Sequence, residues 1–196
     1  MVAVDPVSGI GHDQPELLHT GDTDIDPLGV ARRSHDTAVE DLLVVGEHME
    51  DRAHCYIWVP NALLPDGQKV LSAWGFDYKS NIVWHKIRKD GGSDGRGVGF
   101  YFRNVTEILL FGTRGKNART LAPGRRQVNM MQTRKREHSR KPDEQYELIQ
   151  DCSWGPYLEL FGRGVREGWT VWGNQADADY KPGWKTYRYN SGVAAE

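Results

Sequence analysis

The sequence predicts an α/β fold in which a mostly parallel sheet is covered by helices on both faces. Short apolar segments of strand length alternate with segments of helical periodicity, which is the order expected of such a fold. The apolar segments are continuous rather than interrupted by polar residues, as in strands that are buried on both faces. The length of 196 residues fits one domain, and a hydrophobic content of 38% can supply its core.

Five continuous apolar segments predict the buried strands. In chain order they are residues 55–59, 80–85, 106–111, 157–161 and 170–172. Two weaker segments, Val2–Val4 and Val128–Met131, also resemble short strands.

Three helices are predicted between these strands. Thr37 and Glu40 form a capping-box pattern that opens a short helix over residues 37–43. A second helix is expected over residues 65–74, where a glycine directly after it provides a stop signal. A third is expected over residues 142–152, with apolar residues near one face.

Composition divides the chain into three parts. Residues 1–35 contain turn residues and little periodicity, so we expect a diverged or poorly ordered segment there. Residues 36–180 carry the periodic segments and should form the folded domain. Residues 181–196 should form a C-terminal tail.

Charge is strongly segregated along the chain, although the net charge is only -2. Residues 1–54 hold 12 Asp/Glu and 3 Lys/Arg, whereas residues 84–141 hold 4 Asp/Glu and 15 Lys/Arg. A basic face concentrates phosphate, so the pattern favours contact with nucleic acid over a merely solvated surface. We expect Arg134, Lys135 and Arg136 to contact phosphate.

Cysteine usage and hydropathy indicate the compartment. Cys55 and Cys152 lack the spacing of a metal site and are expected to be reduced core thiols. No apolar run approaches the roughly 18–20 residues that cross a bilayer, and no export signal is recognisable. We therefore expect a cytoplasmic protein.

Two polar segments follow predicted strands, where parallel α/β sheets bind their ligands. Glu159–Gly164 combines a carboxylate with closely spaced glycines, and Trp172–Gln175 ends in two amides. Such groups suit the amine and ribose of a nucleoside ligand, although a tight turn and a pair of capping amides are the simpler alternatives. We expect the two segments to form one pocket.

Several motifs together resemble one enzyme family. Prokaryotic and phage members of the adenine methyltransferase family that includes the catalytic subunit of the messenger-RNA adenosine methyltransferase share them in the same order. The motifs are Tyr56–Asn61, Gly97–Glu107, His138–Glu144, Glu159–Arg163 and Trp172–Gln175. The resemblance implies a Rossmann-like methyltransferase sheet with a permuted order of motifs, the catalytic loop lying near the N-terminus.

The resemblance also implies the roles of individual residues. The residues expected to bind S-adenosylmethionine are Lys141, Glu159, Arg163, Asn174 and Gln175. Lys86, Glu107 and Ser139 would lie closer to the target base.

The family signature Asp-Pro-Pro-Trp does not occur in this chain. Asp5 and Pro6 are its nearest counterpart and are the predicted catalytic residues, but the second proline and the tryptophan are replaced by Val7 and Ser8. A lost stacking surface is worth roughly 1–3 kcal/mol per base. The alternative hypothesis is therefore a catalytically degenerate member that binds nucleic acid or scaffolds an active methyltransferase.

The expected reaction is methyl transfer from S-adenosylmethionine to the exocyclic amine of adenine, by in-line displacement and without a metal ion. DNA is expected ahead of RNA, a target in a duplex would be flipped out of the stack, and a homo- or hetero-oligomer is compatible with the sequence. A nicotinamide dehydrogenase is disfavoured, because the chain lacks a G-x-G-x-x-G opening.

Overall fold

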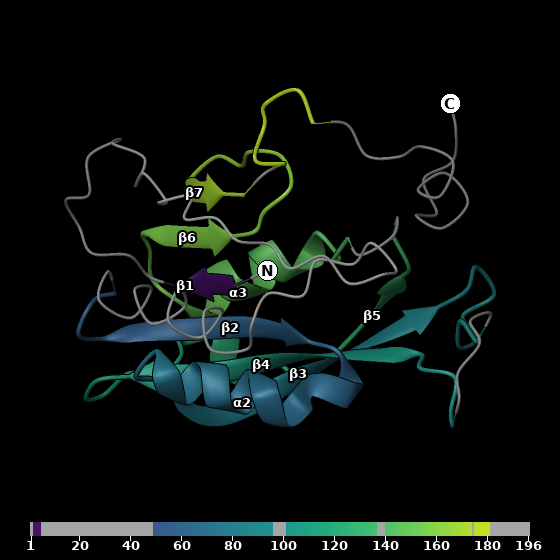
Figure 1. Ribbon diagram of the computed structural model, residues 1–196, viewed down its shortest axis with the longest axis horizontal. Helices are drawn as coiled ribbons and strands as arrows, with labels where there is room; N and C mark the ends of the chain where they lie inside the picture. Colours follow the sequence, from purple (N-terminus) through teal and green to yellow (C-terminus); the bar gives the residue numbers. More distant parts are fainter. Residues whose placement is uncertain (1, 5–48, 96–100, 137–139, 174, 181–196) are drawn as a thin grey trace, which may run out of the picture.

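Seven strands form a single mixed sheet in the described part of the chain (Figure 1). The computed structural model describes residues 2–4, 49–95, 101–136, 140–173 and 175–180. The strands are β1 (Val2–Val4), β2 (Ala53–Val59), β3 (Asp77–Ile87), β4 (Thr106–Arg114), β5 (Met130–Arg134), β6 (Tyr157–Leu160) and β7 (Trp169–Trp172). The helices are α2 (Leu64–Ala73) and α3 (Glu144–Cys152), and the 3-10 turns are η1 (Asn61–Leu63) and η2 (Pro123–Arg126).

The element predictions are confirmed wherever they fall on described residues. Each of the seven predicted strand segments corresponds to a strand, although β3 begins at Asp77 rather than at residue 80. Helices α2 and α3 occupy the predicted segments to within a few residues. The predicted helix over residues 37–43 lies outside the described residues, as do most of segment 1–35 and the tail 181–196.

The predicted mostly parallel pairing is not confirmed. The strand order is β5-β3-β4-β2-β1-β6-β7, and four of its six pairings are antiparallel. Five strands run in one direction, but β1 and β4 run in the other and each lies between two of the five. The reason is that strands buried on both faces have the same continuous apolar pattern in either direction.

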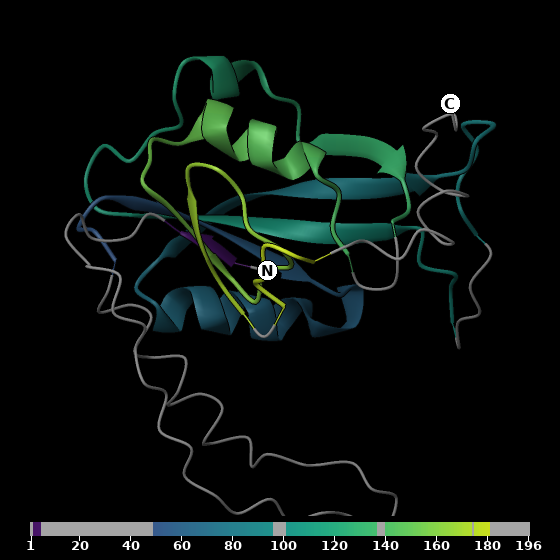
Figure 2. The ribbon, with the colours of Figure 1, turned by 90° about the horizontal axis from the view of Figure 1, so that it is seen from above.

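Helices cover both faces of the sheet, as predicted: α2 lies on one face and α3 on the other (Figure 2). Strand β2 supplies both cores, since successive side chains of a strand point to opposite faces. Ile57 packs with Leu71 of α2, whereas Trp58 packs with Ile149 of α3. Helix α2 packs closely because a Cβ on Gly67 would lie 2.5 Å from a methyl of Val59.

Cys55 and Cys152 are both buried thiols that form no disulfide within the described residues, in agreement with their prediction as core thiols. None of the helices in the described ranges is long and apolar enough to cross a membrane.

Candidate active site

One edge of the sheet gathers the functional candidates. The five strands that share a direction end there, and β4, which is reversed, begins there. Lys86 lies near the end of β3, Glu107 near the start of β4, and Lys141 shortly before α3. The alternation of side chains places Lys86 and Glu107 on the face that α3 covers, because Trp84 and Leu109 of the same strands pack with that helix.

Glu107 bridges two lysines that are distant in sequence. Its Oε1 accepts a hydrogen bond of 2.5 Å from Nζ of Lys86, and its Oε2 accepts one from Nζ of Lys141. The side chains of Lys86, Lys141 and Glu107 are only 14%, 18% and 23% exposed. The three charges therefore sit in a partly desolvated cluster that carries a net positive charge.

The lysines determine the protonation state of Glu107. Burial acts to raise the pKa of this carboxyl group, but the hydrogen bonds and charges of Lys141 and Lys86 outweigh it and lower the pKa below its ordinary value. Glu107 is therefore ionised at neutral pH.

Two tryptophans form the floor of the cluster. Nζ of Lys86 lies 5.0 Å from the ring centroid of Trp84, and Nζ of Lys141 lies 5.5 Å from that of Trp58. The two rings meet edge to face at 5.8 Å. The indole of Trp58 donates a 2.5 Å hydrogen bond to Gln145 of α3, which fixes the floor against the helix.

A second carboxylate, Glu159 of β6, is buried under the first turn of α3. It is 1% exposed, and both of its oxygens accept a hydrogen bond from the hydroxyl of Tyr146, at 3.0 and 2.9 Å. Burial raises the pKa of Glu159, and the hydrogen bond from Tyr146 offsets this only in part. Burial, followed by the charge of Glu159, likewise raises the pKa of Tyr146. The guanidinium of Arg166 lies over the Tyr146 ring, 3.5 Å from its centroid.

The turns after β6 and β7 lie against each other. Arg163 and Gln175 form a backbone bridge, and the amide of Gly164 donates to the carbonyl of Gln175 at 2.7 Å. Gly162 must lack a side chain, since a Cβ there would lie 2.3 Å from Val171. The sequence prediction that the two segments lie together is supported for Arg163 and Gln175, whereas Asn174 lies outside the described residues.

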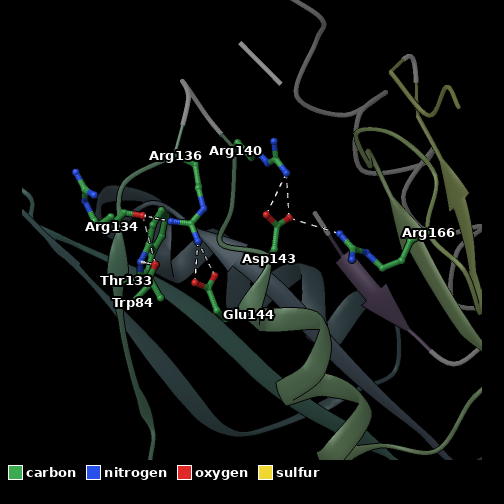
Figure 3. Close-up of polar contacts among 8 residues, drawn as sticks. All are labelled: Trp84, Thr133, Arg134, Arg136, Arg140, Asp143, Glu144 and Arg166. Atoms are coloured by element: carbon green, nitrogen blue, oxygen red, sulfur yellow. Dashed lines mark hydrogen bonds and ion pairs between the residues drawn. The ribbon is translucent and has the colours of Figure 1, made fainter. Parts of the chain in front are cut away.

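The predicted phosphate-binding residues do not share one environment. Arg136 is buried rather than exposed: Nη2 donates to both oxygens of Glu144 at 2.7 and 2.9 Å, and Nη1 donates to the Arg134 carbonyl at 2.6 Å (Figure 3). Its charge thus joins β5 to α3 and does not face solvent. Arg134 is half-buried and Lys135 is exposed.

Asp143, directly before α3, holds two further arginines. Arg140 donates to both of its oxygens at 3.1 Å, and Arg166 approaches Oδ1 at 3.5 Å from the segment between β6 and β7 (Figure 3). The contacts tie that segment to the N-terminal end of α3, next to Tyr146.

The predicted catalytic residues Asp5 and Pro6, and Ser139, lie outside the described residues. The strand before Asp5 has a clear direction, however. Val4 pairs with Cys55 and with Leu158, near the starting ends of β2 and β6. The carboxyl end of β1 therefore lies at the edge opposite Lys86 and Glu107.

Sequence reasoning missed the residues that support the site from α3. Tyr146 appeared only as part of the apolar helix face, and its hydroxyl contact with Glu159 was not anticipated. Gln145 is fully buried against Trp58. A charged or amide residue on the buried face of a helix is the one signal that could have identified Gln145.

Comparison with known proteins finds one matching family and several related sequences. The MT-A70 family profile matches residues 30–175. The N(6)-adenosine-methyltransferase subunit METTL3 of Danio rerio is 31% identical over 133 residues, which are 66% of this chain and 22% of that protein. The catalytic subunit METTL3 of Homo sapiens is 29% identical over 133 residues, which are 66% of this chain and 23% of that protein.

A third relative, the N(6)-adenosine-methyltransferase MT-A70-like protein of Drosophila melanogaster, is 29% identical over 133 residues, 66% of this chain and 22% of its own length. The chain spans little more than a fifth of these relatives. The matched interval 30–175 includes Lys86, Glu107, Lys141 and both glycine turns, and it covers well over half of the sequence. The chain therefore belongs to the MT-A70 family.

Proposed function

We propose that this chain is an S-adenosylmethionine-dependent methyltransferase that modifies the exocyclic amine of adenine in nucleic acid. Membership of the MT-A70 family supports the reaction class, and the matched relatives are named N(6)-adenosine methyltransferases. The observation that carries the proposal is the Lys86–Glu107–Lys141 cluster at the sheet edge where β6 and β7 also end.

The residues at this edge fit the proposed cofactor. Lys141 supplies a cation for a carboxylate, and Gln175 supplies donors and acceptors for ribose hydroxyls. The close backbones of Gly162 and Gly173 leave a surface without side chains, since a Cβ on Gly173 would lie 2.9 Å from the Gly162 carbonyl oxygen. Phe161 has a φ of 59°, which is rare for a residue other than glycine and is often retained at functional sites.

When bound, S-adenosylmethionine would supply an electrophilic methyl group, which the adenine amine takes in exchange for a proton. The chain's own residues act by positioning the two partners, which supplies much of the acceleration in a direct displacement. Glu107 is a weak proton acceptor because its pKa is lowered. Its proposed role is to hold Lys86 toward the nucleic acid and Lys141 toward the cofactor.

Exposed cations beside the edge are proposed to bind the nucleic-acid backbone. Lys135 is exposed and Arg134 is half-buried, and both lie at the end of β5. Arg136 is not part of this proposal, because Glu144 neutralises its charge. DNA is proposed ahead of RNA, as is a cytoplasmic location. A hetero-oligomer is also proposed, since the Danio rerio relative is named a subunit.

The catalytic role of Asp5 and Pro6 remains a proposal from the family motif. The direction of β1 counts against it, as the carboxyl end of that strand lies at the far edge. The substitution Asp5→Ala decides: lost methyl transfer with retained cofactor binding supports Asp5, whereas full activity removes it from the mechanism.

The deciding experiment measures incorporation of labelled methyl groups into DNA and RNA oligonucleotides. Lys141→Met should abolish calorimetric binding of S-adenosylmethionine and methyl transfer, whereas Lys69→Met, on the exposed surface of α2, should change neither. Binding of cofactor and nucleic acid without any transfer would favour the degenerate alternative, which the missing Asp-Pro-Pro-Trp signature supports. Absence of cofactor binding in the unaltered chain would refute the proposed methyl transfer and favour the degenerate alternative, which requires no cofactor.

A further inference from the structure

A cavity lies on the α3 face of the sheet, at the end of β4 that is remote from Glu107. Its volume is about 420 Å³, and no acidic residue lines it. The lining includes three cations, two hydroxyl groups and one aromatic ring, namely Lys79, Arg119, Arg125, Thr113, Thr120 and Phe111. The cavity thus has the chemistry of an anion site and takes no part in the proposed active site.

A buried hydrogen-bond chain fixes the loop that carries two of these cations. His54 is 1% exposed, and its Nε2 lies 3.1 Å from the carbonyl oxygen of Ala118. Since a carbonyl only accepts, Nε2 carries the proton, and Nδ1 then accepts from Ser153 at 2.7 Å. Tyr56 completes the chain by donating to Ser153 at 2.8 Å. Burial lowers the pKa of His54, in keeping with this neutral tautomer.

The same loop is attached to the C-terminal end of α3. The amide of Leu121 donates to the carbonyl of Cys152 at 2.8 Å. Gly124 packs so closely on Cys152 that a Cβ there would lie 2.5 Å from its Sγ. The loop is therefore held from two sides, and the cavity is formed before any ligand arrives.

The cations of the cavity are available for an external anion. Nε of Arg125 donates to the carbonyl of Thr120 at 3.1 Å, which orients the guanidinium and leaves its terminal nitrogens for a ligand. Lys79 pairs with Asp77 at 3.3 Å, but both side chains are at least half exposed, so that pair is weak. Arg119 is exposed and contributes a third charge. The three cations come from β3 and from the loop between β4 and β5, and guanidinium groups form bidentate hydrogen bonds with phosphate.

We propose that the cavity lined by Lys79, Arg119 and Arg125 binds a backbone phosphate of the nucleic-acid strand whose adenine lies at the Glu107 edge. Thr113 lies six positions after Glu107 on β4, so the two places are about 20 Å apart at about 3.3 Å per residue. This span equals roughly six nucleotides at 3.4 Å per step of a helical strand. The inference rests on the proposed function and defines how far the substrate extends.

Oligonucleotide length provides the test. Fluorescence anisotropy would measure binding of a 24-nucleotide and a 6-nucleotide single strand, each with one central adenine, between about 50 and 200 mM salt. The double variant Lys79→Gln/Arg119→Gln should lower the slope of log K against log salt by about 0.7 per contact, or about 1.4 in total, for the long strand alone. Arg119→Lys should retain most of the slope, and Lys69→Gln on the opposite face serves as the charge control.

Three results would overturn the inference. An unchanged slope for the long strand would mean that the cavity binds no backbone phosphate. An equal decrease of the slope for the short strand would mean that the cations act only through long-range electrostatic attraction and not by contact with a phosphate. If inorganic phosphate raises the thermal midpoint of the unaltered chain but not of the double variant, while the slopes agree, the ligand is a free anion and the inference fails. Methyl transfer by the unaltered chain tests the proposed function separately.

Discussion

The substitution Glu107→Gln should destabilise the fold by about 2–3 kcal/mol at neutral pH. Each ammonium–carboxylate pair contributes about 4 kcal/mol at 4 Å and an effective dielectric constant near 20, before the cost of desolvation. Removal of the carboxylate leaves Lys86 and Lys141 repelling each other in a partly buried site. Breaking a fully buried pair costs about 3–5 kcal/mol, and the residual exposure of 14–23% reduces that figure.

Urea unfolding at pH 7.5 and low salt would measure this loss. Asp66→Asn is the matched control, because its pair with Lys69 is exposed and should contribute less than about 0.5 kcal/mol. Since the pKa of Glu107 is lowered in the folded state, its contribution is present above the ordinary glutamate range and disappears as the pH falls through the folded-state pKa. The stabilities of the wild type and the variant should therefore converge only once the pH has fallen below the lowered folded-state pKa of Glu107. A difference under about 0.5 kcal/mol at pH 7.5, or one that persists in acid, would refute the reasoning.

Three further predictions concern the carboxylate under α3, the glycine turn and the buried histidine. Glu159→Gln should raise the thermal midpoint at pH 7 and weaken cofactor binding measured by calorimetry. Because the pKa of Glu159 is raised in the folded state, burial of its charge lowers the stability of the wild type as the pH rises through that pKa. The gain in thermal midpoint should therefore vanish near pH 4, where the glutamate is protonated in both states. Gly162→Ala should destabilise by about 1–3 kcal/mol in urea unfolding, since its Cβ would overlap Val171; an unchanged midpoint would show that the turn relaxes freely. Because the pKa of His54 is lowered in the folded state, the wild type loses stability as the pH falls below about 6.5. The stability of His54→Gln should therefore change less between pH 7 and 5. Parallel stability profiles of the two proteins would contradict the assignment of a neutral His54.

The strands could be predicted from the sequence, but their directions could not. Continuous apolar segments such as 106–111 mark a buried strand because both faces are covered, and that pattern does not depend on whether the neighbour is parallel. The consecutive strands β3 and β4 lie side by side and pair antiparallel. The apolar pattern of these strands did not indicate this antiparallel pairing, nor the reversed direction of β1.

Sequence motifs indicated Lys86, Glu107 and Lys141 as candidate site residues, but not the contacts among them. Lys86, Glu107 and Lys141 come from three motifs, and nothing in their spacing indicates that one carboxylate holds both ammonium groups. Arg136 resembled its neighbours in a basic tract, yet it is buried because Glu144, eight residues later, turns toward it at the start of α3. A side-chain pairing that depends on the position of a helix in the folded protein cannot be recognised from the local sequence pattern.

The tryptophans beneath the two lysines provide an intrinsic fluorescence signal for ligand binding at this site. Trp58 lies under Lys141 and Trp84 under Lys86, so a bound carboxylate or phosphate that draws either ammonium away alters the electric field at one particular ring. Indole emission shifts with such a field, and the roles proposed for Lys141 and Lys86 assign the two rings to different ligands. Difference spectra against Trp58→Phe and Trp84→Phe separate these signals from the rest of the seven tryptophans. If Lys141 holds the cofactor and Lys86 the nucleic acid, as proposed, the arrival of each can be timed independently in one unlabelled protein.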